Sequence, residues 1–168
     1  VEGIESGASL GLGVRVIAED SWGFAASSDL SADGIAATAR QAVAIARASA
    51  LAPGAPVRLA DLEPATDTWS GPCDIDPFDV ALEDKVALLT ESEAALRSEE
   101  AVRLTKAHLG FYRVRKAFGS SAGSFIEQEH HESGGGISAT VIGDGEVLTR
   151  SYPNSHGGQW RQGGWEVV

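Results

Sequence analysis

Alternating apolar and polar residues near the start of the chain predict a β-hairpin. Residues 13–18 and 21–27 are rich in β-favouring side chains and flank the polar pair at 19–20. Trp22 and Phe24 alternate with small residues, so they are expected on the same face of the second strand. The pattern therefore predicts two short antiparallel strands joined by a tight turn.

A helix with small side chains is predicted to follow the hairpin. Ser31 is a typical N-cap residue, and apolar or small residues then recur at helical spacing as far as Ser49. Proline and glycine at 53–56 end the helix, and residues 57–59 are expected to add a short strand. Its alanine-lined stripe would let the helix lie close to a sheet.

A second helix is predicted after a proline- and glycine-containing acidic stretch, residues 61–77, which we interpret as a linker. Asp76-Pro77 or Asp79 is expected to open this helix. Its apolar stripe at helical spacing consists of Leu82, Val86, Leu89 and Leu96.

The rest of the chain has strand character interrupted by residues that favour turns. The predicted strands are 104–118, 124–131, 136–142 and 146–152. The predicted breaks between them are 119–123, 133–135 and 143–145, each of which contains glycine. This order predicts an antiparallel meander.

The element order predicts an α+β fold, with two main helices packed on one face of an antiparallel sheet of sequential hairpins. We expect a hairpin and helix in residues 1–60, a linker at 61–77, and a helix with an antiparallel meander in 78–168. The first residue is not Met, and the apolar run 163–168 resembles a strand. We therefore expect both ends to be trimmed, with the second part truncated at its C-terminal end.

Composition and charge narrow the possible functions. The 168 residues carry a formal net charge of −11, which would repel phosphate backbones and anionic lipid. Binding to nucleic acid is not expected. No window resembles a membrane span, and Cys73 is the single cysteine, which favours a reducing, cytoplasmic location.

The segment 119–123 matches G-x-S-x-G, the pattern that presents a nucleophilic serine between a strand and a helix. Here the following residues, 125–129, favour a strand instead. We therefore interpret 119–123 as a hairpin loop and assign no catalytic residue.

His130-His131-Glu132 has the side-chain types of a zinc site. Adjacent strand residues point to opposite faces, however, so the two imidazoles are not expected to converge on one ion. We predict no metal site in this chain. His108 lies alone in an apolar strand, which favours a structural histidine. Gly11-Leu12-Gly13 lacks the third glycine of a dinucleotide-binding loop, because Val16 occupies that position.

The segment 151–165 combines glycine, aromatic and polar residues, which is unusual for a simple connection. Two interpretations remain open: tryptophans that cap the sheet, or a surface that contacts peptide or another subunit. The residues expected on such a surface are Tyr152, Asn154, Ser155, His156, Gly157, Gly158 and Trp160.

The chain resembles the TldD/PmbA family of peptidases, once described as modulators of DNA gyrase. The similar segments are, in order, 11–16, 21–25 with 29–31, 42–48, 76–78 with the helix through Lys85, and 151–155. The last two resemble the TldD side of the family. The resemblance extends over nearly the whole chain. The resemblance implies the N-terminal region of a zinc metallopeptidase that cleaves peptides or unfolded proteins, with zinc held by an H-E-x-x-x-H helix.

This sequence contains no H-E-x-x-x-H, so no catalytic or metal-binding residue is carried over from the family. The resemblance leaves this region an architectural role as a chamber wall and as a surface for peptide or for a homo- or heterodimer partner. The alternative is that it belongs to a metal-free paralogue that acts only as a partner or binding subunit. The chain alone is not expected to be an enzyme.

Overall fold

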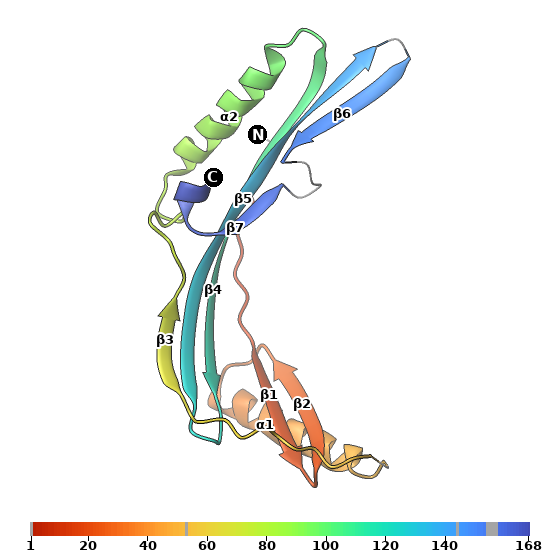
Figure 1. The fold of residues 1–168 in the computed structure, drawn as a ribbon, viewed down its shortest axis with the longest axis vertical. Coiled ribbons are helices and arrows are strands. Elements are labelled where there is room, and N and C mark those ends of the chain that lie inside the picture. Colours follow the sequence, from red (N-terminus) through yellow and green to blue (C-terminus); the bar gives the residue numbers. More distant parts are fainter. Residues whose placement is uncertain (1, 53, 144, 154–157) are drawn as a thin grey trace. The chain divides into compact units, whose positions relative to one another are not determined.

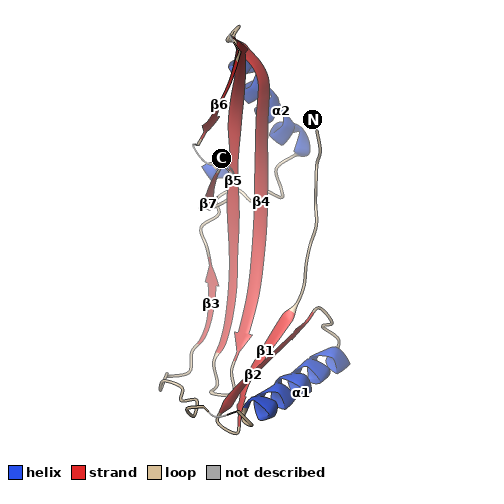
Figure 2. Cartoon of the chain, turned by 90° about the vertical axis from the view of Figure 1, so that its right-hand side faces the viewer, coloured by secondary structure: helices blue, strands red, loops and turns tan. Residues whose placement is uncertain are grey.

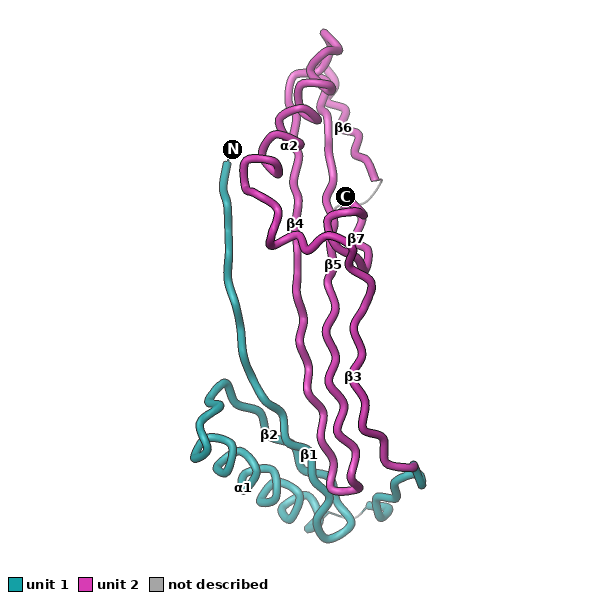
Figure 3. The backbone as a smooth tube through the Cα atoms, turned by 90° about the vertical axis from the view of Figure 1, so that its left-hand side faces the viewer, with its two compact units in different colours: residues 1–62 teal, residues 63–168 magenta. Residues whose placement is uncertain are grey.

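The computed structural model describes residues 2–52, 54–143, 145–153 and 158–168. The chain forms two compact units, Val1–Leu62 and Glu63–Val168 (Figure 3). The combination of helices with largely antiparallel strands confirms the predicted α+β class. Within the described part of the chain, no helix has both the length and the apolar character needed to cross a membrane.

The first unit begins with the predicted hairpin, formed by β1 (Leu12–Ala18) and β2 (Ser21–Ser27). The strands pair antiparallel from Leu12 opposite Ser27 to Ala18 opposite Ser21. Glu19 and Asp20 both have positive φ, 52° and 58°, which is the geometry of a tight turn matched to the twist of a hairpin. The predicted strands and turn are confirmed.

Helix α1 (Ala32–Ser49) packs on one face of this hairpin (Figure 2). Ser31 caps it as predicted, because its hydroxyl accepts a hydrogen bond from the backbone N–H of Gly34. The helix buries Thr38, Ala42 and Ala46, and small side chains at these positions allow a close approach to the strands. The strand expected at 57–59 is not formed; Val57 donates one backbone hydrogen bond to Asp20.

The second unit is built on two long antiparallel strands, β4 (Val102–Gly119) and β5 (Phe125–Gly143). Along the other edge of β5 lie three short strands: β3 (Thr66–Ser70), β7 (Gln159–Gln162) and β6 (Glu146–Tyr152). β6 and β7 are antiparallel to β5, whereas β3 is parallel to it. One strand therefore organises the whole sheet.

Helix α2 (Leu82–Arg97) lies along one face of the β4–β5 pair (Figure 1). Odd-numbered residues of β4 point toward it: Arg97 donates a hydrogen bond to the Thr105 hydroxyl, and the Lys85 ammonium lies 5.2 Å from the centre of the Phe111 ring. Strand alternation then places the even-numbered residues of β4 on the opposite face.

Several local expectations differ from the structure. Residues 133–135 do not interrupt the meander, because β5 runs through them with β4 on one side and β7 on the other. The segment 61–77, expected as a linker, contains β3. The predicted single sheet with two helices is divided in two, so that each helix packs on the sheet of its own unit.

Both ends of the second unit also differ from prediction. Helix α2 begins at Leu82 rather than at 76–79, because Asp76 receives hydrogen bonds from Phe78 and Arg113 instead of capping a helix. Leu82, expected in the buried stripe, is 47% exposed. The strand-like run at 163–168 contains a 3-10 turn, Trp165–Val167, since Trp165 donates its backbone N–H to the Ile75 carbonyl.

Candidate functional site

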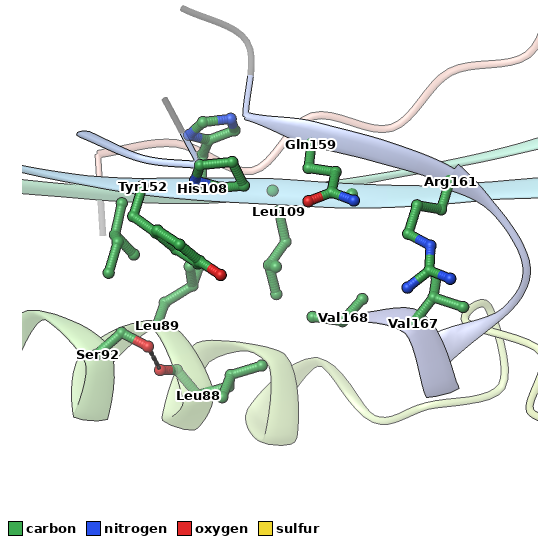
Figure 4. Close-up of a pocket in the computed structure, with 15 residues that line it drawn as sticks. Leu88, Leu89, Ser92, His108, Leu109, Tyr152, Gln159, Arg161, Val167 and Val168 are labelled. Carbon is green, nitrogen blue, oxygen red and sulfur yellow. Dashed lines mark hydrogen bonds between the residues drawn. The ribbon is translucent and has the colours of Figure 1, made fainter. Parts of the chain in front are cut away.

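A cavity of about 350 Å³ lies between α2 and the sheet of the second unit. Leu88, Leu89 and Ser92 of α2 form one wall, and Leu109 with the glycines of β5 forms the opposite wall. Tyr152 and Arg161 point into the space from β6 and β7, while the His108 ring lies on the other side of the strands (Figure 4). The lining is largely apolar, and its polar side chains include the phenol of Tyr152, the hydroxyl of Ser92, the amide of Gln159 and the guanidinium of Arg161.

Trp160 lies on the sheet face opposite α2. Its ring centre is 5.2 Å from that of Tyr112. Gly134 lies beneath the indole, where an added Cβ would come within 2.9 Å of the Trp160 ring, and Gly110 also faces the indole. These glycines are needed for space, so the glycine run in β5 allows a large aromatic side chain to pack directly on the strands.

The residues predicted to share one surface are therefore divided between two faces. Tyr152 lines the cavity on the α2 side, whereas Trp160 packs with Tyr112 on the other side. Gly158 has a φ of +73°, a conformation that favours glycine, and it approaches Gly135 and Gly136 of β5. Asn154, Ser155, His156 and Gly157 lie outside the described residues.

Asp76, Arg113 and His131 form a half-buried polar cluster on the α2 side of the sheet. The Arg113 guanidinium binds the Asp76 carboxylate through Nη2 and donates from Nε to His131 Nε2 at 3.0 Å. The same guanidinium lies 4.8 Å from the centre of the Phe78 ring. This arrangement fixes the loop before α2 to the two central strands.

Glu166 forms a second connection between the same loop and the end of the chain. Its carboxylate accepts backbone hydrogen bonds from Ile75 at 3.0 Å and Gly164 at 2.7 Å. Desolvation raises the pKa of Glu166, but backbone N–H donors outweigh it and lower that pKa to about 2. Desolvation and the nearby carboxylates of Glu166 and Asp76 raise the pKa of the Cys73 thiol, so it is a poor nucleophile at neutral pH.

The histidines of the sheet do not assemble a metal site. His130 is adjacent to Trp69 and pairs with Glu132 at 3.4 Å, whereas His131 is adjacent to Phe78 and Asp76. Among the residues with described positions, no group of three His, Cys, Asp or Glu side chains is arranged to hold a metal ion. The described residues therefore do not fit zinc.

The G-x-S-x-G segment is a hairpin turn, as predicted. The Ser120 and Ser124 backbones are hydrogen-bonded at 2.9 Å across it, and strand β5 follows directly. Gly123 adopts a φ of +100°, which explains a glycine at the end of the turn. Ser121 is exposed and has no helix N-terminus behind it, so the nucleophile geometry is not formed.

Sequence reasoning missed the roles of Arg113, Arg161 and Asp76. The local sequence favours Asp76 as a helix-opening residue, because its partner Arg113 is 37 residues away in the sequence. Arg161 belongs to the segment 151–165, whose composition indicates only a polar, glycine-rich loop, yet its side chain lines the cavity. A concentration of basic residues in the β4 segment was a visible signal, because this strand holds no acidic residue in an acidic chain.

Comparison with known proteins supports the family assignment. A search of the curated proteins returned no match. Two family models match the chain: PmbA/TldA metallopeptidase domain 1 over residues 1–46, and PmbA/TldA metallopeptidase central domain over residues 75–166. The second match alone covers more than half of the chain. The chain therefore belongs to the PmbA/TldD family of metallopeptidases.

Proposed function

We propose that this chain is the non-catalytic N-terminal region of a TldD-like zinc metallopeptidase that degrades or processes peptides. Its role is to wall the peptidase chamber and to offer a surface for peptide and for a partner subunit. The observation that carries this proposal is the match of residues 1–46 and 75–166 to the first and central domains of the family. The metal and the catalytic groups belong to the part of the peptidase outside these domains.

The open edge of β4 supports peptide binding. Within the described part of the second unit, β4 pairs with β5 along one edge and with no strand along the other. Its 18 residues therefore present a long row of backbone donors and acceptors. An extended peptide that adds to such an edge gains main-chain hydrogen bonds and requires little sequence preference.

The outer face of the β1–β2 hairpin supports subunit pairing. Trp22 and Phe24 lie on the face opposite α1 and remain 43% and 53% exposed. The Arg15 guanidinium lies 5.7 Å from the centre of the Trp22 ring and 6.0 Å from that of Phe24. Aromatic and arginine side chains in this arrangement are enriched at protein interfaces, so we assign this face to a second copy or a family paralogue.

The proposal is tested with the full-length protein and with this chain in parallel. Full-length protein, alone or with its paralogue, should hydrolyse a quenched fluorescent peptide, and a chelator should abolish the activity until zinc is restored. The chain alone should bind the peptide in fluorescence anisotropy without cleaving it. If the full-length protein binds peptide but does not cleave it, the alternative role as a metal-free partner subunit is favoured. If the chain alone cleaves the peptide and Ser121→Ala abolishes this cleavage, the non-catalytic role is refuted.

A further inference from the structure

The β4 strand is strongly basic in an otherwise acidic chain. The protein has 24 acidic and 13 basic residues, yet β4 holds five basic residues and no acidic one. These five are Arg103, Lys106, Arg113, Arg115 and Lys116. Positive charge is therefore concentrated on the one long strand of the second unit that has an open edge.

Two of these cations pair with carboxylates, and the other three form no ion pair with any residue whose position is described. Arg113 binds Asp76, and Arg115 lies 2.9 Å from a Glu129 carboxylate oxygen. Arg103, Lys106 and Lys116 are exposed, and among the described residues they form no ion pair. Lys106 and Lys116 lie on the sheet face opposite α2, away from the acidic residues of that helix.

We propose that the open edge of β4 selects extended peptide segments rich in Asp and Glu. A strand added at this edge would place its side chains directly beside those of β4, where opposite charges attract and like charges repel. Carboxylates of the added segment would then face Lys106 and Lys116 on one sheet face. Backbone hydrogen bonds would supply affinity, and the unpaired cations would supply the charge preference.

The charge pattern also argues against a second copy bound through the same strand. Antiparallel pairing of β4 with β4 would place basic strand against basic strand, which is unfavourable at short distance. Nucleic acid is disfavoured because a phosphate backbone has no main-chain N–H and C=O groups to pair with the open strand edge. An acidic extended peptide satisfies both the open backbone edge and its cations.

This inference rests on the proposed function, since the bound segment is the peptide substrate. The probe is a fluorescein-labelled Thr-Glu repeat peptide, compared with Thr-Gln and Thr-Lys repeats of equal length. We expect the full chain to bind in the order Thr-Glu, Thr-Gln, Thr-Lys, with the preference decreasing as salt is added. N-methylation of every peptide amide should abolish binding, because it removes the donors that an added strand needs on either of its edges.

The variant Arg103→Gln/Lys106→Gln/Lys116→Gln should bind the Thr-Glu peptide about tenfold more weakly and the Thr-Gln peptide unchanged. This loss is expected mainly from the two exposed charge pairs that Lys106 and Lys116 would form with Glu side chains on their sheet face. The matched control is Arg40→Gln/Arg47→Gln/Arg58→Gln, which removes the same charge from exposed positions of the first unit. We expect the control to bind like wild type. Circular dichroism of both variants verifies that the fold is retained.

Each other outcome has a distinct meaning. If no repeat peptide binds, the peptide-binding part of the proposed function fails together with this inference. If all three peptides bind equally, the proposed function stands and the charge preference is refuted. An equal loss in both triple variants would assign the preference to net charge rather than to β4. Two further results would refute the inference. One is that single-stranded DNA binds more strongly than the Thr-Glu peptide. The other is that the β4 variant aggregates while its peptide preference is unchanged.

Discussion

Replacing Gly23 with alanine should separate α1 from the hairpin of the first unit. An added Cβ at Gly23 would lie 2.5 Å from the Ala46 nitrogen and 2.8 Å from the Ala46 Cβ, and it would also meet the Ala42 carbonyl oxygen. Two of these three atoms belong to the helix backbone, which cannot rotate away. The helix must therefore move outward by about 1 Å to restore normal carbon contacts.

The cost of this shift is large relative to the stability of the unit. Overpacking of a buried site costs about 1–3 kcal/mol. A unit the size of Val1–Leu62 is expected to have a total stability of about 3–9 kcal/mol. Among its described residues, the buried apolar ones are Ala25, Ala42 and Ala46. The contact between α1 and β2 therefore holds most of the core of this unit. We expect the Tm of the first unit to fall by about 10 °C.

Gly13→Ala is the matched control. Gly13 lies on the other face of the hairpin, where an added Cβ would meet the Phe24 ring at 2.9 Å. That ring is 53% exposed and can turn toward solvent. Both substitutions reduce the entropy of the unfolded chain by the same amount, worth up to about 1 kcal/mol, so the difference between them isolates the packing cost.

Hydrogen exchange followed by mass spectrometry provides the assay, because it reports on each unit separately. In Gly23→Ala, amides of α1 should exchange faster, while those of α2 keep their wild-type protection. Gly13→Ala should leave both helices unchanged. The packing argument would be refuted if the α1 amides of Gly23→Ala exchanged as slowly as in wild type and the Tm stayed within about 1 °C of the wild-type value.

The remaining predictions concern the second unit. The pKa of Glu166 is lowered to about 2 in the folded state, so its carboxylate stabilises the fold above the ordinary pKa of 4.5, and this stabilisation is lost as the pH falls through 2. Glu166→Gln should therefore weaken the pH dependence of the free energy of unfolding in urea between pH 4.5 and pH 2. An unchanged dependence in this range would contradict the assignment. Arg113→Lys should lower the free energy of unfolding by about 1–2 kcal/mol, because lysine lacks the planar guanidinium whose separate nitrogens bind Asp76 and His131. Arg115→Lys, at an exposed pair, should cost under about 1 kcal/mol, and equal losses in urea titrations would refute the distinction. Trp160→Ala should speed amide hydrogen exchange in β7, because it removes the contact with Tyr112, and Trp160→Phe should largely restore slow exchange. Identical exchange rates in the two variants would show that the aromatic contact is not stabilising. Metal analysis after dialysis should find no stoichiometric zinc, and one zinc per chain that is lost in His131→Ala would show that the sheet binds metal after all.

The residue pattern predicted elements whose signals are local. The N-cap at Ser31, the turn at Glu19-Asp20 and the glycine turn before β5 each depend on residues within a few positions of one another. The same local argument separated His130 from His131, because side-chain alternation is a property of any strand. Resemblance in short segments was sufficient for the family, which two family models support.

Tertiary structure decided whatever depends on partners distant in the sequence. The glycines at 134–136 signal a turn by themselves, but β4 and β7 hydrogen-bond β5 on both sides and keep it extended, and Trp160 occupies the space that side chains would fill. Asp76 resembles a helix cap until Arg113 of β4 binds its carboxylate, and Glu166 turns the last residues by accepting backbone hydrogen bonds from across the unit. The open edge of β4 also exists only in the folded sheet, because strand order is set by long-range pairing that local residue preferences do not encode.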